Sequence, residues 1–193
     1  MRHLILSATF LACGGVLMLA CGGGANVNVA GLKNSAANIA NSVANAVSGA
    51  TTSSPESFMK DAAQGGQAEV KMGDLAAKNA KNPDLKKFAQ MMVTDHGAAG
   101  KDLEELAKKK NFTLPTDIGS HQATYDKLSK MTGDDFDRYY VEQMVQDHEA
   151  DVKEFQKQAA NSSDPDVKAF AAKVAPVVQK HLDAIKAIQA KMK

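Results

Sequence analysis

Cysteine is almost absent from this 193-residue sequence. Its two cysteines, Cys13 and Cys21, both lie in or beside an apolar stretch at the N-terminus. Because that stretch resembles an export signal that is removed, a single cysteine remains in the mature chain and no internal disulfide can form. The fold is therefore expected to be held by packing alone.

An excess of charge is missing as well. The 23 Lys and Arg residues nearly balance the 22 Asp and Glu residues, and the net charge is +1. Binding to a polyanion requires a basic surface, so no nucleic-acid partner is expected. The sequence also lacks a nucleophilic triad, a P-loop and a glycine-rich phosphate-binding loop. An enzymatic role is therefore not the first expectation.

The N-terminus indicates export and lipidation. Residues 1–20 have a short basic start and an apolar core, which predicts a signal peptide. The stretch LMLAC, ending on Cys21, resembles a bacterial lipobox, in which the cysteine is lipidated and becomes the mature N-terminus. We expect this lipid to anchor the protein in the cell envelope, in the outer membrane facing the periplasm, because Gly22 is not the aspartate associated with inner-membrane retention. The alternative is plain secretion after cleavage beside a nearby alanine.

A flexible tether is expected to follow the anchored cysteine. Residues 21–55 consist largely of Gly, Ala, Asn and Ser and contain no aromatic residue. Such a segment buries too little apolar surface to offset the entropy lost on ordering it. We therefore predict a tether over 21–55 that leads to a folded domain over 56–193.

Strand-like alternation is absent beyond the tether, and apolar residues recur there with the 3.6-residue period of helices. Two helix starts are clear, because Asn82-Pro83 and Asp164-Pro165 each place a capping residue before a proline. We predict an all-α domain with four long helices at about 56–80, 83–110, 134–161 and 165–192.

An internal repeat indicates how these helices are connected. The 21 residues from Glu69 resemble the 21 residues from Asp151, as expected for a repeated helical hairpin. A long connection over 111–133, with a short helix-like run, separates the two hairpins. A connection of this length lets helices two and three run parallel. We predict a ferritin-like four-helix bundle with a long crossover between helices two and three.

One ionisable residue interrupts the apolar stripe of each predicted helix. These residues are Glu69, His96, His148 and His181, in chain order. Glu69 lies 13 residues before Asn82 and His96 lies 14 residues after it. His148 lies 16 residues before the Asp164 cap, and His181 lies 17 residues after that cap. If the two hairpin turns are at opposite ends, all four side chains meet at mid-bundle.

This layer predicts a metal site. Asp151, one turn after His148, is a fifth candidate ligand. Asp95 and Asp147 each precede a histidine directly, and are placed to accept a hydrogen bond from an imidazole N–H. Imidazole and carboxylate ligands suit zinc first, with iron or manganese as alternatives. The nearby methionines, Met91, Met92 and Met144, leave copper open.

A core without metal is the other interpretation. Buried His, Asp and Glu side chains can bond to one another across a bundle and set the register of its helices. The two hypotheses are therefore a metal-binding envelope protein, with a role in metal handling or stress response, and a structural or partner-binding bundle.

Several motifs together resemble a known bacterial family. They are, in chain order, Gly-Gly-x-x-Glu-Val from Gly65, Met-Val-x-Asp-His ending at His96, Leu114-Pro115, Gly-Asp-Asp-Phe-Asp from Gly133, a second Met-Val-x-Asp-His ending at His148, and Pro176 followed by His181. Over about residues 56–190 the chain is similar to the family called domain of unknown function 4142, whose members are exported or predicted outer-membrane proteins. The resemblance implies a ferritin-like fold and an envelope location, and it implies no activity.

The sequence departs from the ferritin-like iron enzymes at one motif. Those enzymes usually carry Glu-x-x-His on two helices. Here the residues three before His96 and His148 are Val93 and Val145. A ferroxidase or an oxygen-activating di-iron site is therefore not expected.

Overall fold

The computed structural model describes residues 52–192, which contain five α-helices and a short 3-10 helix. In chain order the elements are α2 (Pro55–Asn79), α3 (Pro83–Lys109), η1 (Gly119–His121), α4 (Gln122–Leu128), α5 (Gly133–Asn161) and α6 (Pro165–Lys191). None of the described residues forms a strand, so the all-α prediction is confirmed. The signal peptide, Cys21 and nearly all of the predicted tether lie outside the described residues.

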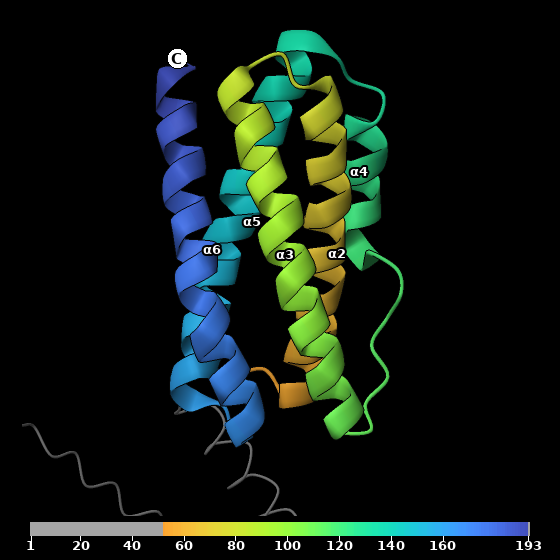
Figure 1. Ribbon diagram of the computed structural model, residues 1–193, viewed down its shortest axis with the longest axis vertical. Coiled ribbons are helices and arrows are strands. Elements are labelled where there is room, and N and C mark those ends of the chain that lie inside the picture. Colours follow the sequence, from red (N-terminus) through yellow and green to blue (C-terminus); the bar gives the residue numbers. More distant parts are fainter. Residues whose placement is uncertain (1–51, 193) are drawn as a thin grey trace, which may run out of the picture. The chain divides into compact units, whose positions relative to one another are not determined.

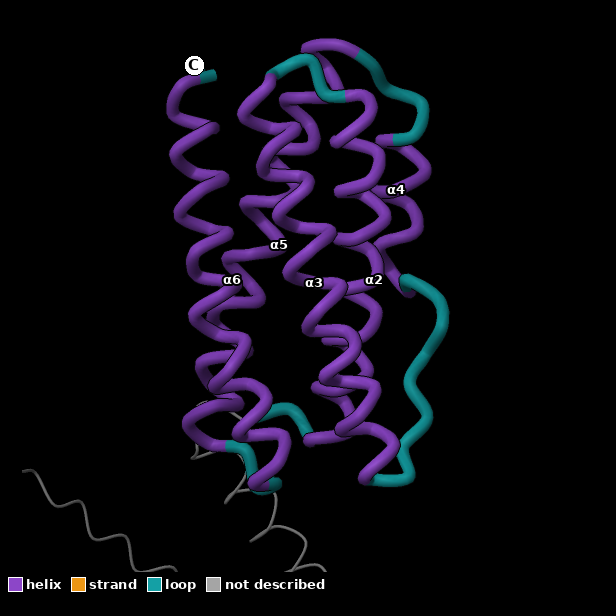
Figure 2. Tube along the Cα trace, viewed as in Figure 1, coloured by secondary structure: helices purple, strands orange, loops and turns teal. Residues whose placement is uncertain are grey.

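The four long helices form two antiparallel hairpins whose turns lie at opposite ends (Figure 1). The α2–α3 turn is at the top of the view and the α5–α6 turn at the bottom, so α3 and α5 run parallel. The crossover leaves the lower end of α3 as an extended loop, and its η1 and α4 segments pack on α2 (Figure 2). The ferritin-like topology predicted from the repeat is confirmed.

Side-chain caps begin the helices where the sequence predicts them. The Asn82 side-chain oxygen accepts a hydrogen bond from the Asp84 N–H at 2.8 Å. The Asp164 carboxylate accepts from the N–H groups of Asp166 at 3.0 Å and Val167 at 3.1 Å. In both helices the proline after the cap occupies a position whose N–H would have no partner within the helix.

Polar contacts fasten the two hairpins together at both ends. At one end the buried Asp137 carboxylate of α5 accepts hydrogen bonds from the backbone N–H groups of Lys81 at 3.0 Å and Asn82 at 2.8 Å. At the other end Lys110 forms an ion pair with Asp164. These contacts join the α2–α3 turn to the start of α5 and the end of α3 to the start of α6. They fix the depth of one hairpin against the other.

The apolar core is divided into two clusters. The cluster near the α2–α3 turn includes Phe88, Met92 and Tyr140. The cluster near the opposite end includes Phe58 and Phe155, whose ring centroids are 5.0 Å apart. On each helix, the predicted polar residue falls close to the point where one cluster ends and the next begins. None of the described helices is long and apolar enough to cross a membrane.

Gly73 lies where α2 packs directly on α3, and it gives a test of the packing. A Cβ added at Gly73 would lie 3.0 Å from Val93 Cγ2 and 3.1 Å from the Ala89 carbonyl oxygen. We expect Gly73→Ala to destabilise the protein, because overpacking costs about 1–3 kcal/mol and alanine regains only about 1 kcal/mol of helix propensity. A Cβ added at Gly97 meets nothing within 4 Å, so Gly97→Ala should be stabilising. Urea denaturation of both variants measures the difference, and equal shifts would contradict the packing.

Candidate metal centre

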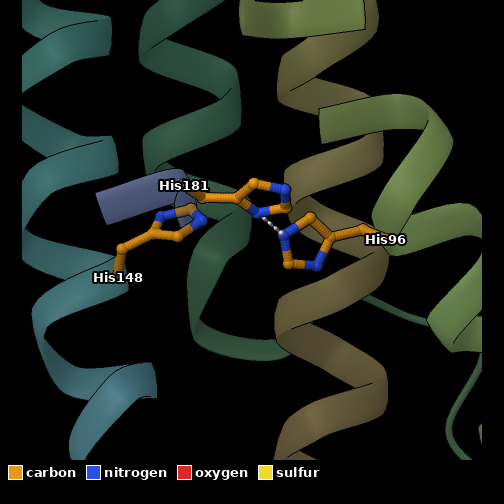
Figure 3. A group of neighbouring side chains, drawn as sticks. All are labelled: His96, His148 and His181. Atoms are coloured by element: carbon orange, nitrogen blue, oxygen red, sulfur yellow. Dashed lines mark hydrogen bonds between the residues drawn. The ribbon is translucent and has the colours of Figure 1, made fainter. Parts of the chain in front are cut away.

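The layer predicted at mid-bundle is formed by one side chain from each long helix. Glu69 comes from α2, His96 from α3, His148 from α5 and His181 from α6. All four are buried, with exposed fractions of 3%, 7%, 0% and 0%. The three imidazoles converge (Figure 3), and each offers a ring nitrogen such that the three nitrogens lie within 4.8 Å of one another.

Glu69 lies against two of the imidazoles. Its Oε2 is 3.0 Å from His96 Nδ1, and its Oε1 is 3.4 Å from His148 Nδ1. Asp151, half-buried on α5, is a neighbour whose carboxyl interacts with that of Glu69. The two carboxyl groups beside the imidazoles therefore come from α2 and α5.

Hydrogen bonds fix the tautomers of two histidines. His148 Nδ1 is 2.9 Å from the Met144 carbonyl oxygen, which can only accept, so Nδ1 carries the hydrogen. His148 Nε2 then holds a lone pair, and this atom is buried without a partner among the described residues. His181 Nε2 lies 3.0 Å from Asp95 Oδ2 and donates to it, which leaves a lone pair on His181 Nδ1.

The third histidine connects this system to Glu69. His96 Nε2 is 3.2 Å from His181 Nδ1. When Glu69 is protonated, it donates to His96 Nδ1, and His96 Nε2–H donates to His181. When Glu69 is ionised, it accepts from His96 Nδ1–H, and two lone pairs then face each other at 3.2 Å. The cluster therefore requires one cation, which is either a proton or a metal ion.

Burial sets the charge of the cluster. It raises the pKa of Glu69 to about 7 and lowers the pKa of His96 to about 4. It also lowers the pKa values of His148 and His181. Near neutral pH the three imidazoles are therefore uncharged, which is the form that binds metals.

The remaining predicted residues have different surroundings. Asp95 bonds to an imidazole N–H, that of His181, as its place before His96 allows. Burial and the negative charge of Glu69 raise the pKa of Asp151 well above its usual value. Asp147 has no hydrogen bond to the three imidazoles among the described contacts. Burial raises the pKa of Asp147, and its interaction with His121 of the crossover partly offsets that shift.

A small cavity adjoins the layer on the side away from the α2–α3 turn. Glu69, His96 and Asp151 line it, and its volume is about 30 Å³. This is enough room for a water molecule, which would have several polar partners there. A bound ion could therefore keep a water ligand without any rearrangement of the helices.

Two participants were missed by reasoning from the sequence. The Met144 carbonyl orients His148, but a main-chain acceptor leaves no side-chain signal. The Tyr140 hydroxyl is buried without a partner in the described part of the chain. Burial and the charge of Glu69 raise its pKa. Tyr140 lies two turns before His148 on the same face of α5, so the helical period of the sequence could have placed its side chain in the core.

Comparison with known proteins identifies the family. Residues 40–188 match the family described as domain of unknown function (DUF4142), and the chain belongs to this family. A comparison with curated proteins returned no match.

Solved structures with the same fold include a copper protein. CopM in the Cu(II)-bound form is 20% identical with a TM-score of 0.62, covering 72% of this chain and 98% of that chain. CopM has also been solved in a Cu(I)-bound form, with 19% identity, a TM-score of 0.62, and coverage of 72% and 96%. A DUF305 fragment from Deinococcus radiodurans is 10% identical with a TM-score of 0.63, covering 71% of this chain and 95% of that fragment. These similarities establish the shared fold, and the histidine cluster is compatible with a bound metal ion.

The opposite pKa shifts predict a pH dependence of stability in metal-free protein. His96 stays neutral in the fold while it gains a proton in the unfolded chain below about pH 6.5, so its contribution rises with pH between about 4 and 6.5. Glu69 keeps its proton in the fold up to about pH 7 but loses it near pH 4.5 when unfolded, so its contribution falls with pH across that window. The substitution Glu69→Gln removes the contribution of Glu69, which falls with pH, and leaves the contribution of His96, which rises with pH.

We therefore expect the free energy of unfolding of Glu69→Gln to rise more steeply between about pH 4.5 and pH 6.5 than that of the wild type. Denaturant unfolding in the presence of a chelator measures both curves. Glu105→Gln, at an exposed position on α3, is the control and should follow the wild type. Parallel curves for wild type and Glu69→Gln would contradict the assigned shift.

Proposed function

We propose that His96, His148 and His181 bind a transition-metal ion, with Glu69 and Asp151 supplying negative charge. The observation that carries this proposal is the direction of the lone pairs. The Met144 carbonyl and the Asp95 carboxylate occupy the outer nitrogens of His148 and His181. The inner nitrogens are thereby left as acceptors in a buried space.

The spacing of the nitrogens fits one ion. Two nitrogens bound at 2.0–2.1 Å to a tetrahedral ion are ~3.3 Å apart. His96 Nε2 and His181 Nδ1 are 3.2 Å apart. The third nitrogen lies within 4.8 Å of the others, so coordination would draw the His148 ring inward by up to about 1.5 Å.

Copper is the metal we propose first, and zinc second. At sites rich in imidazole nitrogen, Cu²⁺ binds more tightly than Zn²⁺. Met92 and Met144 are fully buried one turn from His96 and His148, and thioethers are soft ligands suited to Cu(I). The likeness to CopM, solved with copper in both oxidation states, supports the same choice. We propose a role in binding and buffering the metal.

A metal-free polar network is the second candidate, and one observation favours it. A single proton on Glu69 would complete a chain of hydrogen bonds through His96 and His181 to Asp95. That arrangement still leaves His148 Nε2 buried without a partner. An unpaired buried acceptor is costly, whereas a bound cation would satisfy it.

Metal titration distinguishes the two candidates. We expect the wild type to bind one equivalent of copper, and His96→Ala or His148→Ala to weaken binding by at least about 100-fold. The double variant should lose little more, because ligands of one ion act as a unit. Metal at 100 times its dissociation constant should add about 2.7 kcal/mol of stability to the wild type. Isothermal titration and thermal unfolding measure these effects.

His121→Ala is the matched control, because His121 lies in the crossover outside the cluster. It should bind copper as the wild type does. Equal melting temperatures for the wild type with copper, with zinc and with chelator would support the metal-free network. Additive losses from the two single variants would likewise reject a shared ion.

We propose in addition that a lipid on Cys21 holds the protein in the envelope. The apolar residues 4–19 and the LMLAC stretch support this proposal. Intact mass spectrometry of protein extracted from membranes should find an N-terminus at Cys21 that carries acyl chains. Cys21→Ala should release unprocessed or secreted protein. An unmodified mature N-terminus in the wild type would refute lipidation.

A further inference from the structure

Three glycines in α2 and α3 have no packing explanation. Glycine weakens a helix relative to alanine, so a glycine in a helix interior needs a reason. Gly73 has one, because an added Cβ would meet the facing helix. A Cβ added at Gly66, Gly97 or Gly100 would meet nothing within 4 Å. The contacts between the helices therefore do not require these three glycines.

All three glycines line the same groove. This groove lies between α2, α3 and residues 114–116 of the crossover, and its volume is about 560 Å³. Its apolar lining includes Ala62, Ala63, Val70, Leu103 and Leu114. The groove extends inward to His96, which at 7% is the most exposed of the three imidazoles. A side chain at any of the three glycine positions would reduce this space.

The wall of the groove is held in place by hydrogen bonds from α2. Gln67 Nε2 donates to the Pro115 carbonyl oxygen at 2.9 Å. Gln64 Nε2 donates to the Asp117 carboxylate at 2.7 Å, two residues further along the crossover. The crossover is thus pinned beside the groove and does not fill it. The groove is therefore present before any ligand binds.

Charge at the rim indicates what kind of ligand fits. Lys71 on α2 and Lys101 on α3 both line the groove and are exposed. Neither lysine has a carboxylate within 4.0 Å in the described part of the chain. Glu104 is the single acidic residue in the lining, so the rim carries a net positive charge. The volume lies within the roughly 300–1,000 Å³ that is usual for sites of small molecules.

We propose that this groove binds a small amphiphile, with its apolar body over the glycines and an anionic head group near Lys71 and Lys101. The proposal goes beyond metal binding. Apart from His96, no residue of the metal centre lines the groove. The ligand class is an organic carboxylate or sulfonate with an aliphatic or aromatic body.

The probe for this site is 1-anilinonaphthalene-8-sulfonate, added to the folded full chain in the presence of a chelator. We expect saturable fluorescence with one site per chain. Gly97→Leu and Gly100→Leu should each weaken binding by about tenfold or more, because the added side chain occupies the groove. Their melting temperatures should not fall, since leucine is a better helix former than glycine.

Ala98→Leu is the control, because Ala98 is exposed on α3 beside these glycines and does not line the groove. It should bind the probe as the wild type does. Non-saturable fluorescence, or full binding by both glycine variants, would overturn the proposal. His148→Ala should leave probe binding unchanged. Failure of the metal-binding proposal would therefore leave probe binding intact, and failure of the groove proposal would leave metal binding intact.

The head-group assignment has its own test. The neutral probe N-phenyl-1-naphthylamine has a similar apolar body and no charge. The double variant Lys71→Ala, Lys101→Ala should weaken binding of the sulfonate about tenfold and leave the neutral probe within about twofold. Equal effects on the two probes would overturn the anionic assignment.

Discussion

The structure depends on burying Glu69 together with three imidazoles at the centre of a small bundle. Polar side chains removed from water destabilise a protein unless each finds a partner, so these four residues must meet at one level. The helix ends are arranged to achieve that. Opposed turns, matched distances from the caps, and contacts at both ends of the bundle set the depth of each helix. An error of one turn in any helix would leave a buried ionisable group alone.

The end contacts also explain why the core is divided. Asp137 holds the α2–α3 turn against α5, and Lys110 holds the end of α3 against the start of α6. Apolar side chains then fill the bundle between these contacts and the central layer, one cluster on each side. The central layer is thus enclosed by well-packed helices, and its tautomers are set by Met144 and Asp95.

The two spaces beside His96 differ in size and character. The inner cavity of about 30 Å³ has three carboxyl side chains among its mostly apolar lining, those of Asp61, Glu69 and Asp151. The outer groove of about 560 Å³ is also largely apolar, and Lys71 and Lys101 lie at its rim. A cation or a water molecule suits the first, and an organic anion suits the second. Gly66 lines both spaces, and so the same helical turn of α2 limits each of them.

The length of the crossover allowed opposed turns, and the structure confirmed them. The sequence by itself determined the helices, their caps and the matched distances of Glu69, His96, His148 and His181 from those caps. Helical period, rise per residue and capping chemistry are local properties, so spacing along the chain was sufficient for these features. Only the tertiary structure decided which ring nitrogens face inward, that Asp147 lies near His121, and that the crossover leaves a groove open. Those features depend on side-chain rotamers, on a main-chain carbonyl and on the path of a loop, and no periodic pattern in the sequence encodes them.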